Sequence, residues 1–167
     1  MNALFYVFLF LHVTAAIVAF GPTFAFPLIA KAGMKHPQHA AFAAEVNERI
    51  ESVLVMPLAL SMPVTGAGMI ISGGVNLFQP WLLAAIVVYV VAIGYSALIQ
   101  GPTGKELTQL LQAMPAGLPG PGAALAEATA GPPPRLMELG ARMQRGGMLL
   151  GGLLLVIIFL MVVKPGA

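Results

Sequence analysis

Four long apolar segments dominate the hydrophobic pattern of the chain. The first carries no charged side chain over residues 1–30, and three more apolar runs follow it. A helix that crosses the bilayer core needs about 20 apolar residues, whereas a membrane β-barrel needs alternating segments of about ten residues. The sequence has the first pattern and lacks the second. We therefore predict an all-α, four-helix transmembrane bundle, with spans at about 3–30, 52–72, 78–99 and 146–163.

The segments next to the spans differ in kind. Residues 36–51 contain good helix formers and no glycine, so we expect them to extend the second span into the cytoplasm as a helix. Pro22 and Pro27 are expected to kink the first helix or to end it toward Lys31. In residues 113–134, ten of 22 residues are Gly or Pro, which predicts a flexible cytoplasmic loop.

Composition and charge narrow the class of protein. Of all residues, 59% are hydrophobic and 8% are charged, whereas a soluble domain carries about 25% charged residues. The chain is therefore expected to form a single integral membrane domain over residues 1–167, with the lipid bilayer as its first partner. A net charge of +2 is too weak for a nucleic-acid-binding surface, and the absence of Cys removes disulfides and thiol catalysis.

The basic residues collect on one side of the predicted bundle. Seven of the eight lie in or beside the first and third connections, namely Lys31, Lys35, Arg49, Lys105, Arg135, Arg142 and Arg145. The second connection has none, and the C-terminal end has only Lys164. Because Lys and Arg are enriched in cytoplasmic loops, we expect both long connections in the cytoplasm. Both termini then lie on the outer side of a bacterial inner membrane.

One ionisable side chain, His12, falls inside a predicted span. At 1.5 Å per residue it lies roughly 14 Å into the first helix, and Ala15, Ala16 and Ala19 share its face. An intramembrane ionisable residue suggests function by default. One interpretation makes His12 an axial haem ligand or a proton-relay group. The other makes it a structural residue that hydrogen-bonds a Ser or Thr on another helix.

Three further polar side chains are predicted at a similar depth. Ser61 and Thr65 share one face of the second span, and Tyr89 is central in the third. With His12 they would form a polar layer at the bilayer midplane. The layer either lines a path for a small solute or holds the helices together, because Ser and Thr hydroxyls also bond to carbonyls of their own helix.

The remaining polar groups give weaker indications. His36 and His39, with Glu45 nearby, lack the spacing of a zinc site, and we assign no metal site. Glu51 is expected on a solvated helix face or contact surface. No carboxylate lies within a predicted span, and no nucleophile–base pair is visible, so we expect no enzyme.

Gly147 and Gly151 form a G-x-x-x-G pattern at the start of the fourth span. Small residues four positions apart let two helix backbones approach closely. The partner helix belongs either to the same subunit or to another subunit, and the sequence leaves both alternatives open.

Several segments resemble a known family. They are F-L-H-V-T-A-A-I-V-A-F-G-P-T-F-A-F-P-L around His12, P-V-T-G-A-G in the second span, A-L-I-Q-G-P-T-G-K-E-L after the third, and the closing F-L-M-V-V-K-P-G. Together they resemble a bacterial family of four-helix integral membrane proteins that is labelled only as a domain of unknown function. A weaker similarity is to the copper-resistance D proteins and the membrane protoporphyrinogen oxidase. It implies His12 as a haem or metal ligand.

These observations predict a membrane protein without an evident catalytic set. We expect an accessory or structural subunit of a membrane complex, or a homo-oligomer. The alternatives are a b-type haem-binding redox protein that uses His12 and, less well supported, a small-solute permease lined by Ser61, Thr65 and Tyr89.

Overall fold

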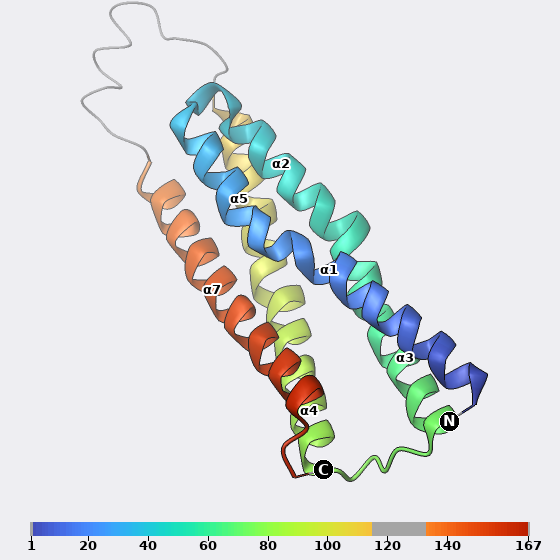
Figure 1. Cartoon of the computed structure of the whole chain (residues 1–167). Helices are drawn as coiled ribbons and strands as arrows, with labels where there is room; N and C mark the ends of the chain where they lie inside the picture. The colour runs from blue at the N-terminus through green and yellow to red at the C-terminus, as the bar shows by residue number, and fades with distance from the viewer. Residues whose placement is uncertain (1, 115–132, 167) are drawn as a thin grey trace, which may run out of the picture.

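The computed structural model describes residues 2–114 and 133–166, and this part of the chain forms four long helical rods without a strand (Figure 1). The rods are α1 (Ala3–Lys35); the turn η1 (Pro37–His39) with α2 (Ala40–Ile50), η2 (Glu51–Val55) and α3 (Met56–Gly73); α4 (Pro80–Tyr95) with η3 (Ser96–Gln100) and α5 (Gly101–Ala113); and α7 (Pro134–Val163). Each rod is long and apolar enough to cross a membrane. The predicted all-α class with four spanning helices is confirmed.

The rods extend beyond the apolar runs of the sequence. α1 continues through Pro22 and Pro27 to Lys35, past the end expected near Lys31. Proline is tolerated inside a membrane helix when neighbouring groups satisfy the freed carbonyls. The predicted flexible loop at 113–134 lies, apart from its two ends, outside the described residues.

The rods pack in a fixed order around the bundle. α1 packs along α2 and α3, α4 packs along α7, and α5 lies against both α2 and α7. Both termini and the α3–α4 connection lie at one end of the bundle, and the α1–α2 connection lies at the other (Figure 1). The four rods therefore alternate in direction, and the end of α5 and the start of α7 lie at the same end of the bundle as the α1–α2 connection.

The interior of the bundle is built largely from small side chains. Ala19, Ala59 and Ala85 are at most 1% exposed, whereas large apolar side chains such as Ile71 and Leu98 point outward. Small residues let membrane helices pack closely, and outward apolar side chains suit a lipid environment. The surface of the bundle is therefore apolar over the spans.

Local signals in the sequence set the helix ends. Asn2 caps α1, because its Oδ1 accepts a hydrogen bond from the Phe5 N–H at 3.0 Å. Gly74 ends α3 with a φ of 64°, a left-handed conformation that glycine adopts without strain. Pro80 occupies the first position of α4, where its missing N–H costs nothing.

Candidate functional site

Aromatic side chains of α1 face glycines of α3 in the half of the bundle that holds the N-terminus. A Cβ placed on Gly68 would lie 2.5 Å from the Phe8 ring, and one placed on Gly73 would lie 2.6 Å from the Phe5 ring. Such distances leave no room for any side chain at these two glycines. We call this contact between α1 and α3 the aromatic–glycine seam. It fixes the depth and rotation of α1 against α3.

His12 lies one turn further along the same face and contacts α3. Its Nδ1 is 2.8 Å from the Thr65 hydroxyl. The Thr65 hydroxyl is also 3.2 Å from the Ser61 carbonyl and 3.1 Å from the Met62 carbonyl. A threonine hydroxyl has a single proton. When that proton goes to either carbonyl, the Thr65 oxygen accepts a hydrogen bond from the His12 Nδ1–H.

The residues around His12 do not fit a flat cofactor such as haem. The small-residue face that continues from His12 is closed, since Ala15 is 7% exposed and Ala19 is 0% exposed. A porphyrin would need that face open and, for two-histidine ligation, a second intramembrane His, which the spans lack. The geometry instead matches the interpretation of His12 as a polar residue bonded to a hydroxyl on another helix.

Tyr89 hydrogen-bonds a carbonyl that a proline has freed. Its hydroxyl donates to the Ala59 carbonyl at 2.7 Å. Ala59 lies four residues before Pro63, which sits inside α3 and has no N–H to bond that carbonyl. Tyr89 on α4 therefore supplies the donor that α3 lacks.

The predicted polar layer is thus brought together only in part. His12 and Thr65 are hydrogen-bonded partners, whereas Ser61 donates to the Leu58 carbonyl of its own helix at 2.7 Å. No hydrogen bond links Tyr89 to His12 among the described residues. The hydroxyls of Ser61 and Thr65 face carbonyls of their own helix, whereas the Tyr89 hydroxyl bonds to a carbonyl of another helix and so joins α4 to α3.

Two of the long rods each contain one π turn, and each turn lies at the same distance before a proline. The turns are Glu51–Val55 and Ser96–Gln100, and each is closed by an N–H that bonds to the carbonyl five residues before it. Pro57 and Pro102 follow at the same offset, six residues after the first residue of each turn. A proline lacks the N–H of a regular α-helical ladder, and a wider turn just before it relieves the local mismatch.

The first residues of the two π turns bond to each other. The Ser96 hydroxyl donates to Glu51 Oε1 at 3.2 Å. The Glu51 carboxylate is half-buried between two rods, so of the two expected places, a solvated helix face or a contact surface, the structure matches the contact surface. A π turn inserts one residue per turn, so it changes which side chains point inward relative to the 3.6-residue period used for the prediction.

Gln100 is a second polar residue that the sequence analysis did not single out. It is 6% exposed, and its Nε2 donates to the Met143 carbonyl of α7 at 2.9 Å. A Cβ on Gly146 would overlap Gln100 Oε1 and would lie 2.9 Å from the Tyr95 hydroxyl oxygen. Gly146 therefore lets α4 and η3 approach α7. A lone Gln at the end of the apolar run was the available signal.

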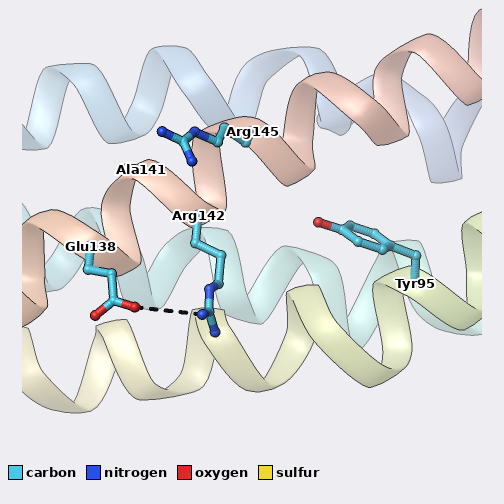
Figure 2. Close-up of a pocket in the computed structure, with 5 residues that line it drawn as sticks. All are labelled: Tyr95, Glu138, Ala141, Arg142 and Arg145. Carbon is cyan, nitrogen blue, oxygen red and sulfur yellow. Dashed lines mark ion pairs between the residues drawn. The ribbon is translucent and has the colours of Figure 1, made fainter.

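A pocket of about 460 Å³ opens beside this contact between the third rod and α7. Its lining residues are Tyr95, Glu138, Ala141, Arg142 and Arg145 (Figure 2). Arg142 lies 3.6 Å from Glu138, and Arg135 lies 3.0 Å from the same carboxylate. None of the ion pairs found in the described part of the chain involves Arg145.

The other predicted site residues lie apart from these contacts. A Cβ on Gly147 or Gly151 would meet no atom of the described residues within 4 Å, so there is open space beside both glycines in this part of the chain. The rings of His36 and His39 are 6.4 Å apart. Over residues 2–114 and 133–166, no group of three or more His, Asp or Glu side chains is placed to hold a metal ion.

Fold and contacts together define a polytopic helical membrane protein in which several polar side chains join neighbouring helices. The chain belongs to the family described as a predicted integral membrane protein (DUF2269), whose model matches residues 6–165. This confirms the family resemblance seen in the sequence. The chain matches no curated protein and no solved structure at a significant level.

Proposed function

We propose that the chain is a non-catalytic structural subunit that assembles in a bacterial inner membrane through the exposed face of α7. A second copy of the chain is the proposed occupant of that face. The observation that carries the proposal is the open space beside Gly147 and Gly151. Of the two alternatives left by the sequence, contact within the subunit has no support in this arrangement.

The position of the glycines supports assembly. Gly140, Gly147 and Gly151 follow one another at spacings of seven and four residues, so they share one face of α7. A Cβ at any of them meets nothing within 4 Å in the described part of the chain, unlike Gly68, which the Phe8 ring fills. A face of this kind is complementary to its own copy across a two-fold axis, because each backbone fits into the groove of the other.

The polar contacts favour this role over the alternatives. The Ser61, Thr65 and Tyr89 hydroxyls, which would line a solute path, are directed at backbone carbonyls. His12 is engaged with Thr65 on a closed face.

Absorbance spectra of the purified protein, with and without added haem, separate this proposal from the haem alternative. A Soret band that disappears in His12→Ala would favour haem.

Assembly is tested with the double variant Gly147→Leu/Gly151→Leu. The matched control is Gly94→Leu on α4, where a Cβ also meets no described atom within 4 Å. We expect wild type and Gly94→Leu to be dimers or larger in mild detergent by light scattering, and the double variant to be a monomer. Leucine side chains hold the two backbones apart and remove the close approach.

Two results would overturn the homo-oligomer. One is wild-type protein that is monomeric in several mild detergents and in native-membrane discs. The other is a double variant that keeps the wild-type mass. If instead a different membrane protein co-purifies with wild type and is lost in the double variant, the chain is an accessory subunit of that complex.

A further inference from the structure

The pocket beside α7 lies where the polar part of this helix meets its apolar part. Arg145 directly precedes the uncharged run at 146–163, and Tyr95 lies near the end of the third apolar run at 78–99. Both side chains are therefore placed at the level of the lipid headgroups, whichever way the bundle is oriented. The pocket lies at the level of that layer.

The lining of the pocket has an excess of positive charge. Two guanidinium groups, those of Arg142 and Arg145, and a single carboxylate, that of Glu138, line the pocket. Figure 2 shows Arg142 turned toward Glu138 and Arg145 turned away from it. Glu138 already pairs with Arg135 at 3.0 Å as well as with Arg142 at 3.6 Å. Its charge is therefore shared, and Arg145 is left without an ion pair in the described part of the chain.

The pocket also has a fixed hydrogen-bonding group. Figure 2 shows the Tyr95 side chain reaching from the third rod toward α7, on the side where Arg142 and Arg145 lie. Gly146 gives it room, because any side chain there would collide with the Tyr95 hydroxyl oxygen. The bond from Gln100 to the Met143 carbonyl holds the two rods together next to it. The hydroxyl and the arginines are thus set on packed helices.

We propose that this pocket binds the phosphodiester headgroup of an anionic membrane lipid. An arginine fork binds two phosphate oxygens at once, and a basic pocket between membrane helices is suited to anionic headgroups. Arg145 supplies the fork, Arg142 adds charge, and Tyr95 donates its hydroxyl proton to a phosphate oxygen. This inference goes beyond assembly through α7, because it concerns lipid binding by each chain.

The test counts lipids bound per chain by native mass spectrometry of the full-length protein. The probe is phosphatidylglycerol, titrated against phosphatidylcholine, which has the same phosphodiester and no net charge. Arg145→Gln is expected to weaken phosphatidylglycerol binding about tenfold, the loss typical of one hydrogen-bonded charge pair. Tyr95→Phe weakens it less. Lys105→Gln, an exposed cation on the same half of the bundle, is the matched control and retains wild-type binding.

Each other outcome has a definite meaning. Equal losses in Arg145→Gln and Lys105→Gln would overturn the site, because binding would then follow overall charge. Inorganic phosphate that binds with the same dependence on Arg145 would overturn the lipid as the source of the phosphate group. Arg145→Lys keeps the charge and loses the guanidinium fork. If it binds more phosphatidylglycerol than Arg145→Gln does, the loss in Arg145→Gln comes from a lost contact and not from misfolding. Unweakened binding in Arg145→Gln would end the proposal.

Discussion

At the scale of single residues, this protein uses side chains to complete the backbone hydrogen bonds of neighbouring helices. In lipid an unpaired carbonyl finds no water, so a donor must come from the protein. Tyr89 provides one to Ala59, whose partner is missing because of Pro63. Asn47 also donates to a carbonyl of another rod, that of Phe26 in α1, at 3.2 Å, although no proline frees this carbonyl. Such contacts are local in space and distant in sequence.

The Tyr89 contact gives a prediction that separates it from ordinary packing. Tyr89→Phe is expected to lower the free energy of unfolding by about 1 kcal/mol, the net value of one such bond in a membrane protein. In a Pro63→Ala background the same change should cost almost nothing, because the N–H of Ala at position 63 then bonds the Ala59 carbonyl. Denaturation in mixed micelles measures both. Equal costs in the two backgrounds would show that the hydroxyl does not serve the freed carbonyl.

Some of these interior polar residues can be predicted from the sequence, and others cannot. The sequence singles out His12 as an ionisable residue inside an apolar run. One of its two predicted roles is a hydrogen bond to a Ser or Thr hydroxyl on another helix. The structure pairs it with Thr65. Gln100 and Glu51 were not identified as interior residues, since a polar residue at the end of an apolar run has the same pattern whether it faces water or another helix.

At the scale of elements, the contact between α1 and α3 depends on large aromatic side chains of one helix that pack against glycines of the other. Phe8 fits against Gly68, and Phe5 fits against Gly73. Their spacings run in opposite directions along the two helices, as an antiparallel pair requires. The close approach of backbones at glycine then brings His12 within reach of Thr65.

The aromatic–glycine seam predicts a larger loss of stability for one glycine-to-alanine change than for another. Gly68→Ala should lower the free energy of unfolding relative to Gly94→Ala by about 1–3 kcal/mol, the usual cost of overpacking. A Cβ at Gly68 would lie 2.5 Å from Phe8, whereas a Cβ at Gly94 meets no atom of the described residues within 4 Å. Phe8→Leu should recover part of the loss in the Gly68→Ala variant. Equal stability of the two single variants, by the same denaturation assay, would contradict the seam.

The π turns mark the limit of prediction at this scale. The periodicity of apolar residues located all four long helices, but it assumes 3.6 residues per turn throughout. The turns at Glu51–Val55 and Ser96–Gln100 break that assumption, and each precedes a proline at the same offset. A proline inside a long apolar helix predicts a local defect. Whether the defect is a kink or a wider turn is decided by packing against the neighbouring rod.

At the scale of the whole molecule, the two ends of the bundle differ strongly in charge. The basic residues other than Lys164 lie in the half that holds α2, α5 and the first turns of α7, where Arg135 also pairs with Glu106 at 2.6 Å. Lys164 is at the opposite end, over the Trp81 ring at 5.5 Å. A protein with cations at one end inserts with that end in the cytoplasm.

The expected orientation can be tested by cysteine labelling, because the sequence contains no native cysteine that would react as background. Leu77→Cys places a thiol in the exposed α3–α4 connection, and Gln38→Cys places one in the exposed α1–α2 connection at the other end. In intact cells a membrane-impermeant maleimide should label Leu77→Cys and reach Gln38→Cys only after the membrane is opened. Seven of eight cations on the Gln38 side would otherwise have to cross the membrane. The reverse labelling pattern would overturn the orientation while leaving the four-helix bundle intact, because packing within the bundle is the same in either orientation.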